Sequence, residues 1–318
     1  MAWEADHLGV GFEAKTLALP NDDEGPVVCT LVRYRPEPAI SHNPVAVLYL
    51  HGWSDYFFQK HLAEFWNSLG INFYALDLRK YGRSLLPGQT PGYITNLNEY
   101  DADLEAAFGA IRKDLANNPK IIINGHSTGG LVASLWTHFH PGEVSALALN
   151  SPWLELQGSA LTRTVSMPAI ATLARVNPKS ILPNIDPGYY SRVIREGNLS
   201  QWEINPAWRP DQTTAVRPGW LQAILNGHAQ VSRGLEIPCP VSVFTSSRTF
   251  ISPIWNDQMR NSDVVLDVEV ISRRALQLGP HVTVVRIKDG LHDLALSRPE
   301  PRRKYFDALR RWVQVYGW

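Results

Sequence analysis

Residues 125–129 read Gly-His-Ser-Thr-Gly, a G-x-S-x-G pattern with Ser127 at its centre. Three isoleucines at 121–123 precede it, which is typical of a strand buried on both faces, and residues 131–140 follow with a helical pattern. A sharp turn between such a strand and such a helix exposes the serine hydroxyl above the sheet, near the positive end of the helix. We therefore predict that Ser127 is a nucleophile, which requires a base within hydrogen-bonding reach.

The elements that must position this serine alternate between strand and helix patterns. Strands are predicted at 45–50, 71–78, 121–123, 144–149, 240–246 and 282–287, and helices at 61–69, 97–116, 131–140 and about 301–314. Residues 11–19 and 27–35 read as two further strands, joined into a hairpin by a turn-rich stretch. The alternation implies a mostly parallel sheet with helices on both faces.

The composition narrows the class of protein. The 318 residues carry 30 Lys and Arg against 30 Asp and Glu, so net charge gives no attraction to nucleic acid or to acidic membranes. The two cysteines are far apart, and no Cys/His spacing suggests a zinc site. Residues 1–15 lack the basic and apolar regions of a signal peptide, and no apolar run is long enough to span a membrane. We expect a cytoplasmic protein without stable membrane insertion; its oligomeric state is unknown.

Residues 153–237 interrupt the alternation of strands and helices. They are rich in Pro, Trp, Tyr and Arg, and their periodicity predicts only short helices. Ligands bind at the carboxyl ends of the strands in open α/β sheets, so we interpret this insertion as a cap that excludes water and shapes a pocket. The alternative is a structural subdomain without a ligand. The predicted organisation is a core in two parts, 1–152 and 238–318, with the cap at 153–237.

Five motifs stand in a characteristic order. They are His51-Gly52-Trp53, Asp77-x-Arg79-x-x-Gly82-x-Ser84, Gly125-His126-Ser127-Thr128-Gly129-Gly130, Ser262-Asp263-Val264-Val265-Leu266-Asp267 and Gly290-Leu291-His292-Asp293. Together they resemble the α/β-hydrolases, in the branch of monoglyceride lipases, lysophospholipases and serine aminopeptidases. The resemblance covers nearly the whole chain outside the cap. It implies an α/β-hydrolase fold, with a mostly parallel eight-stranded sheet, helices on both faces and an inserted helical cap. In size and motif order the chain is also similar to bacterial hydrolases of monoalkyl phthalates.

The resemblance implies which residues complete a catalytic triad with Ser127. His292 follows the last predicted strand near the end of the chain, which makes it the best base among ten histidines. His51 and His126 match positions that are structural in the family. The family's acid comes directly after the strand at 240–246, but here residues 248–261 intervene. We interpret them as an inserted loop and Asp263 as the acid.

Other carboxylates near these motifs have alternative roles. Asp267 is expected at the start of a helix, as its N-terminal cap or first-turn acid. Asp257, inside the inserted loop, is a further candidate for the acid. Asp293 adjoins His292 in sequence, but adjacent side chains point apart, so it is expected to be structural. Asp77, Arg79 and Arg83 are expected to form a structural network rather than a charged site, and Asp101 and Asp103 are better read as solvated or structural than as catalytic.

A tetrahedral intermediate needs two hydrogen-bond donors at its oxyanion. One is expected from the backbone N–H of Thr128, the residue after the nucleophile, and the resemblance implies the backbone N–H of Trp53 as the other. Tyr56 and Phe57, with Phe58 nearby, are candidates to line an acyl or alcohol pocket, although core packing explains Phe57 and Phe58 equally well. Trp202 and Trp220 are the candidate substrate-binding residues of the cap.

The first hypothesis is a serine carboxylic ester hydrolase that needs no cofactor or metal and acts on a small-molecule ester. Cap arginines could bind a free carboxylate of a monoalkyl phthalate or the phosphate of a lysophospholipid. These are Arg163, Arg175, Arg192, Arg195, Arg209 and Arg217. A monoacylglycerol lipase or lysophospholipase is an alternative. An aminopeptidase would use cap carboxylates to bind an amine, the candidates being Glu155, Asp186, Glu196, Glu203 and Asp211. A non-catalytic binding protein of the same fold is the remaining alternative.

Overall fold

The computed structural model describes residues 2–36, 44–116, 118–156, 160–183, 186–198 and 202–317. Its strands are β1 (Glu4–Ala5), β2 (Phe12–Asp22), β3 (Gly25–Tyr34), β4 (Val45–Leu50), β5 (Asn72–Asp77), β6 (Lys120–His126), β7 (Ala146–Asn150), β8 (Val241–Ser246) and β9 (Val282–Ile287). Its α-helices are α1 (Lys60–Ser68), α2 (Asp101–Leu115), α3 (Thr128–Phe139), α4 (Ala160–Val176), α5 (Tyr189–Asn198), α6 (Pro218–Arg233), α7 (Val268–Ala275) and α8 (Pro299–Tyr316).

All of these strands belong to one sheet, in the order β1-β2-β3-β5-β4-β6-β7-β8-β9. The pairs formed by β1, β2 and β3, including β3 with β5, are antiparallel, and every other pair is parallel. The prediction of a mostly parallel sheet, begun by a hairpin, is therefore confirmed. Compared with the eight strands expected, the described residues add the two-residue strand β1 at the edge.

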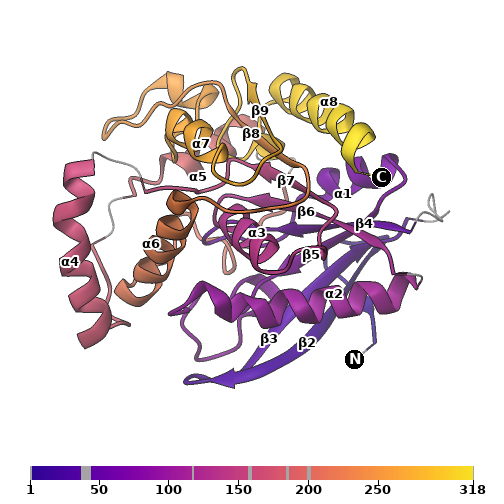
Figure 1. Cartoon of the computed structure of the whole chain (residues 1–318), viewed down its shortest axis with the longest axis horizontal. Coiled ribbons are helices and arrows are strands. Elements are labelled where there is room, and N and C mark those ends of the chain that lie inside the picture. The colour runs from indigo at the N-terminus through magenta and orange to yellow at the C-terminus, as the bar shows by residue number, and fades with distance from the viewer. Residues whose placement is uncertain are drawn as a thin grey trace.

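Alternate residues of the central strands point to opposite faces of the sheet, which divides the core into two apolar clusters. In β4, Leu48 and Leu50 join the cluster under α2, α3, α6 and α7, whereas Val47 and Tyr49 join the cluster under α1 and α8. Figure 1 shows α8 and α2 on opposite sides of the sheet. Helices on both faces bury central strands such as β4 and β7 completely, which is why their sequences read as continuous apolar runs.

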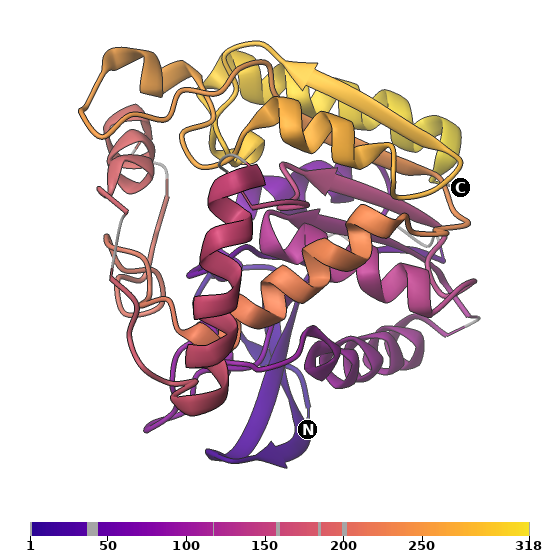
Figure 2. The ribbon, with the colours of Figure 1, turned by 60° about the vertical axis from the view of Figure 1, so that its left-hand side comes forward.

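The segment after β7 carries α4, α5 and α6. Figure 1 shows α4 and α6 at one end of the molecule, with both chain termini toward the other, and in Figure 2 α4 and α6 again lie beside each other. The expectation of only short helices is wrong, because α4 has 17 residues and α6 has 16. Pro168 lies inside α4, where proline usually interrupts a helix, whereas Pro218 begins α6, a position that proline favours.

Helix α6 is not a detached cover. Its residues Trp220, Ala223, Ile224 and Val231 belong to the same apolar cluster as the central strands, so the end of the insertion is continuous with the core. The division of the chain at 152 and 238 therefore stays a prediction. It describes the sequence insertion better than it describes a separate folding unit.

Candidate active site

Ser127 lies at the turn between β6 and α3. Its backbone φ is +52°, a left-handed conformation that is unusual for a residue with a side chain and that marks a tight, strained turn. The flanking glycines make this turn sterically feasible. A Cβ on Gly125 would lie 2.9 Å from the carbonyl oxygen of Gly129, and a Cβ on Gly129 would lie 2.6 Å from the carbonyl oxygen of Leu50. Neither position has room for a larger residue.

The side chains of Ser127, His292 and Asp263 form one chain of contacts. The Nε2 atom of His292 lies 3.1 Å from Ser127 Oγ, and its Nδ1 atom lies 3.0 Å from Asp263 Oδ2. Asp263 is fully buried, while His292 and Ser127 are 3% and 8% exposed. With Nδ1 donating to the carboxylate, Nε2 is free to accept the serine proton. The structure thus brings together the three residues that the sequence suggested.

Asp263 is oriented by its own backbone neighbourhood. Its Oδ1 atom accepts hydrogen bonds from the backbone N–H groups of Val265 and Leu266, both at 2.8 Å, which leaves Oδ2 directed at His292. Asp267 instead accepts from the N–H groups of Glu269 and Val270 and caps α7, as expected. Asp257 has an exposed side chain that pairs with Arg260, and it does not reach His292.

The expected oxyanion donors belong to two segments next to Ser127, the start of α3 and the loop after β4. Thr128 begins α3, and Trp53 follows β4, where a Cβ on Gly52 would lie 3.1 Å from Ser127 Cβ. No hydrogen bond to another described residue occupies the backbone N–H of either Trp53 or Thr128. Two unoccupied donors beside a nucleophile can stabilise a developing negative charge, and the N-terminal end of α3 adds its dipole.

Beneath His292 lies a buried polar network that supports the site. Asp293 accepts hydrogen bonds from the Asn150 side chain at 2.7 Å and from the Ala295 N–H at 2.9 Å, so it faces away from Ser127. His126 contacts the Asn150 carbonyl, and burial lowers the pKa of its imidazole to about 4. His51 accepts a hydrogen bond from the Leu78 N–H. These contacts agree with structural roles for His51, His126 and Asp293.

The other charged residues near the motifs are also committed to structure. Arg83 pairs with Asp77 at 2.8 Å and with Asp6 at 2.7 Å, and Arg79 pairs with the buried Asp103 at 2.7 Å. These ion pairs connect the loop after β5 to α2 and to the N-terminal segment. The expectation of a structural network agrees with this geometry. Among the described residues, no group of three or more His, Cys, Asp or Glu side chains could hold a metal ion.

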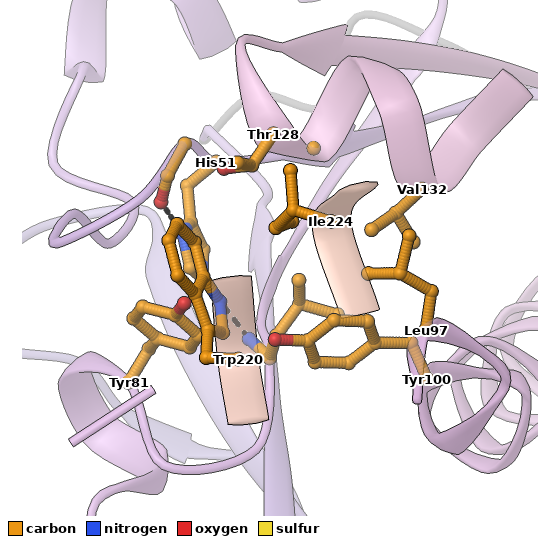
Figure 3. Close-up of a pocket in the computed structure, with 11 residues that line it drawn as sticks. His51, Tyr81, Leu97, Tyr100, Thr128, Val132, Trp220 and Ile224 are labelled. Atoms are coloured by element: carbon orange, nitrogen blue, oxygen red, sulfur yellow. Dashed lines mark hydrogen bonds between the residues drawn. The ribbon is translucent and has the colours of Figure 1, made fainter. Parts of the chain in front are cut away.

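A small cavity lies beside the loop that follows β4, which we call the oxyanion loop after the donor expected at Trp53, and is shown in Figure 3. Its volume is about 10 Å³, which is room for about one water molecule. Trp220 of α6 projects toward it, and its ring centroid lies 3.6 Å from that of Trp53. The lining residues are His51, Gly52, Leu78, Tyr81, Leu97, Tyr100, Thr128, Gly129, Val132, Trp220 and Ile224. The cavity is therefore mostly apolar, and a cap tryptophan forms part of its lining.

The remaining aromatic candidates lie elsewhere. Phe57 is completely buried and packs against Phe12, Tyr49 and Phe73, so its position supports core packing. Tyr56 is also completely buried, and its hydroxyl accepts a hydrogen bond from the Asn205 N–H at 2.8 Å. The Trp202 ring packs at a tilt against His61, with the ring centroids 4.2 Å apart, on the α1 and α8 side, and it does not line the cavity. Of the four candidates, the structure brings only Trp220 to the cavity.

Sequence reasoning missed several residues of this region. Tyr81 and Tyr100 line the cavity, and burial raises the pKa of the Tyr81 hydroxyl. Tyr190 of α5 packs its ring 5.4 Å from the His292 ring. Tyr81 lies within the Asp77-to-Ser84 motif, and this position in the sequence indicated that it lies near the site. Tyr190 lies in the insertion and had no motif around it.

Most cap arginines are already paired. Arg209 is the most buried of them, and its Nε atom lies 3.0 Å from Asp55 Oδ1. Arg192 pairs with Glu196, Arg195 with Asp211, and Arg217 donates to the Lys179 carbonyl. Arg175 is exposed on α4, and the side chain of Arg163 lies outside the described part of the structure. These positions do not form an open cluster of cationic side chains.

The fold and the site together define an α/β-hydrolase. The sequence profile of the family described as serine aminopeptidase, S33, matches residues 42–251, and the chain belongs to this family. A monoacylglycerol lipase from Mycolicibacterium smegmatis is 24% identical over 232 residues, covering 70% of this chain and 78% of that protein. The protein is therefore an ester-hydrolysing enzyme of the monoglyceride lipase-like branch.

Solved structures show the same fold. A monoacylglycerol lipase from Paleococcus ferrophilus superposes with a TM-score of 0.62 at 16% identity, covering 96% of this chain and 99% of that chain. A soluble variant of monoglyceride lipase from Saccharomyces cerevisiae, in complex with a substrate analog, superposes with a TM-score of 0.64 at 13% identity, covering 95% and 96%. No helix in the described ranges is long and apolar enough to cross a membrane.

Proposed function

We propose that this protein is a serine hydrolase that cleaves small to medium carboxylic monoesters through an acyl-enzyme. The observation that carries the proposal is the contact of His292 with both Ser127 Oγ, at 3.1 Å, and Asp263 Oδ2, at 3.0 Å. A serine hydroxyl is a weak nucleophile, and a base at this distance, oriented by a carboxylate, is the arrangement that activates it. Asp263, His292 and Ser127 are the proposed catalytic residues.

The proposed reaction has two halves. Ser127 Oγ attacks the ester carbonyl while His292 Nε2 takes the hydroxyl proton, and Asp263 stabilises the imidazolium. Collapse of the tetrahedral intermediate breaks the bond to the alcohol, which leaves with the proton from His292. Water then attacks the acyl-enzyme with His292 again as base. The carboxylic acid is released, and Ser127 recovers its proton from His292. The backbone N–H groups of Trp53 and Thr128 are the proposed donors to the oxyanion in both halves, each worth roughly 10²-fold or more in rate.

The cavity beside the oxyanion loop has room for about one water molecule, about 10 Å³, and neither Ser127 nor His292 lines it. Any acyl group would therefore enter this space only after cap side chains such as Trp220 move. A short acyl group requires the smaller movement, and a monoacylglycerol or lysophospholipid the larger one. For a substrate with a free carboxylate, such as a monoalkyl phthalate, the most buried cap arginine is Arg209. The substrate carboxylate would have to compete with Asp55 for its guanidinium group.

The candidate carboxylates of an aminopeptidase site are mostly engaged by cations. Glu155 pairs with Arg274 at 2.8 Å, Glu203 with Lys60 at 2.8 Å, and Glu196 with Arg260 at 2.6 Å. Asp211 pairs with Arg195. Carboxylates already neutralised in this way are poor receptors for a substrate amine, and this favours ester over aminoacyl substrates.

The cytoplasmic location expected above stays a prediction.

A direct test is the Ser127→Ala variant together with labelling by a fluorophosphonate probe. We expect wild-type protein to be labelled and to hydrolyse p-nitrophenyl acetate, and Ser127→Ala to lose both properties. Ser134→Ala is the matched control, because Ser134 is a buried serine of α3 that donates to the Gly130 carbonyl. Retained turnover in Ser127→Ala would refute the nucleophile, and an unlabelled, inactive wild type would favour the non-catalytic binding protein.

The substrate class needs a panel of compounds. Esters of increasing acyl length, a monoalkyl phthalate with its dialkyl counterpart, a monoacylglycerol, a lysophospholipid and an amino-acid anilide separate the alternatives. We expect short esters to have the highest kcat/KM. A clear preference for the monoalkyl over the dialkyl phthalate would assign the carboxylate a role in binding. A preference for the anilide over every ester would establish the aminopeptidase alternative.

A further inference from the structure

The loop that follows β4 is held by contacts from the cap. Three consecutive residues of this loop, Ser54, Asp55 and Tyr56, are buried, and each contacts the segment 205–214. They come directly after Trp53, whose backbone N–H is one of the two proposed oxyanion donors. The cap segment therefore contacts the loop within three residues of the proposed donor.

The contacts are specific polar ones. The Thr214 N–H donates to Ser54 Oγ at 2.9 Å, and the two hydroxyl oxygens of Ser54 and Thr214 are also 2.9 Å apart. Arg209 Nε lies 3.0 Å from Asp55 Oδ1, and the Asn205 N–H donates to the Tyr56 hydroxyl at 2.8 Å. Ser54 is thus held twice by a single cap residue, next to the donor.

Ser54 needs to be held in this way. Its backbone φ is +54°, the left-handed region that residues with a Cβ adopt at a cost in free energy. Such a conformation persists only when the surroundings determine it, and here two hydrogen bonds from Thr214 do so. The φ of Ser54 acts on the Trp53–Ser54 peptide, next to the Gly52–Trp53 peptide that carries the Trp53 N–H. A relaxed Ser54 would therefore shift this N–H through the φ and ψ of Trp53.

We propose that Thr214 is a positioning residue for the oxyanion hole, acting through Ser54 on the Trp53 N–H. The proposal rests on the ester hydrolase function and the oxyanion role of Trp53 proposed above. The proposal means that the cap segment 205–214 helps to position an oxyanion donor, in addition to covering the site. The enzyme stabilises the transition state fully only while this segment is docked on the loop.

The test compares Thr214→Val, which removes the hydroxyl at nearly constant volume, with Thr214→Ser, which restores it. Thr213→Val is the matched control, because Thr213 is the half-buried neighbour that takes no part in these bonds. The readouts are kcat and KM for p-nitrophenyl acetate, the melting temperature, and the inhibition constant of trifluoroacetophenone. This ketone forms a hemiketal with the serine and places an oxyanion in the hole.

We expect Thr214→Val to lower kcat about ten-fold, as a displaced oxyanion donor does, with KM nearly unchanged. The inhibition constant of the ketone should rise by a similar factor, Thr214→Ser should recover both values, and Thr213→Val should match the wild type. If Thr214→Val does not fold, Thr214→Ala takes its place in the same comparison. Unchanged kcat and ketone affinity in the folded variant, or an equal loss in Thr213→Val, would overturn the proposal.

A failure of the proposed ester hydrolase function can be distinguished from a failure of the positioning role by a separate measurement. Fluorophosphonate labelling of the wild type at Ser127 is measured first, and its absence would remove both the ester hydrolase function and this inference. When labelling succeeds, an unaffected Thr214→Val removes the positioning role alone.

Discussion

Thr249 and Asp263 form an isolated parallel bridge just beyond the end of β8. The Asp263 N–H donates to the Arg248 carbonyl at 3.0 Å, and the Phe250 N–H donates to the Asp263 carbonyl at 2.8 Å. The inserted loop 248–261 therefore leaves the sheet and returns to it, so that Asp263 lies beside the strand end as if it followed β8 directly. This explains how a chain with an insertion at this point still presents a carboxylate to His292.

The first prediction concerns this acid. Asp263→Asn should lower kcat by about 10⁴-fold, because the amide no longer holds His292 in the tautomer that accepts a proton at Nε2. Asp267→Asn, in the same motif, should leave kcat within about two-fold and change stability little, since asparagine is also a good helix N-cap. Ester hydrolysis and thermal unfolding of the two variants measure both effects. Equal losses of activity would show that the assignment of the acid is wrong.

The second prediction concerns the cavity. Trp220→Leu shortens a side chain that lines it, so the ratio of kcat/KM for octanoate to that for acetate p-nitrophenyl esters should rise by about ten-fold or more, as expected for several newly buried methylenes. Trp202→Leu is the control, because Trp202 packs against His61 and does not line the cavity. Its chain-length profile should match that of the wild type. Parallel shifts in the two variants would contradict a pocket beside Trp220.

The third prediction concerns the turn at Ser127. Gly129→Ala should abolish activity and destabilise the protein by several kcal/mol, on the order of 2–4, because its Cβ meets the backbone carbonyls of Leu50 and His51. Gly109→Ala, on α2 with open space around the position, should instead be neutral or stabilise by about 0.5–1 kcal/mol. Urea unfolding of both variants gives the comparison. A stable, active Gly129→Ala would mean that β4 and α3 are less tightly packed than described.

The fourth prediction concerns stability in acid. Burial lowers the pKa of His61 from 6.5 to about 4, and its Nδ1 atom has no hydrogen-bond partner among the described residues. Between these pH values the unfolded chain binds a proton at His61 and the folded protein does not, so the free energy of unfolding should fall as the pH falls. The contribution of this histidine is on the order of 3 kcal/mol over the whole window.

His61→Gln isolates that contribution. Glutamine keeps a donor for the Ala295 carbonyl, which His61 Nε2 contacts at 2.8 Å, but it does not titrate. Its free energy of unfolding should therefore decrease less steeply than that of the wild type between about pH 7 and pH 4, while the buried His126 keeps part of the slope. Identical slopes for the two proteins would show that the pKa of His61 is the same in the folded and the unfolded protein.

Local patterns in the sequence were enough to predict the sheet, the hairpin and the nucleophilic turn. Strands such as β4 and β6 are continuous apolar runs because both of their faces are buried, and the turn at Ser127 requires glycine at 125 and 129 because backbone atoms lie within about 3 Å of where a Cβ would be. The motif order singled out His292 and Asp263, and Asp267 was correctly separated as a helix cap. Signals of this kind are local, and each is carried by a few adjacent residues.

Only the tertiary structure decided which residues surround those side chains. Trp202 and Trp220 look equivalent in the insertion, yet the first packs against His61 of α1 and the second lines the cavity, because the path of the cap over the sheet is set by packing between distant segments. The same holds for Thr214 and Ser54, which meet across 160 positions of sequence. The turn that holds Ser127 is determined by local sequence, whereas the lining of the cavity and the contacts of the loop after β4 with the cap depend on long-range packing that no local period predicts.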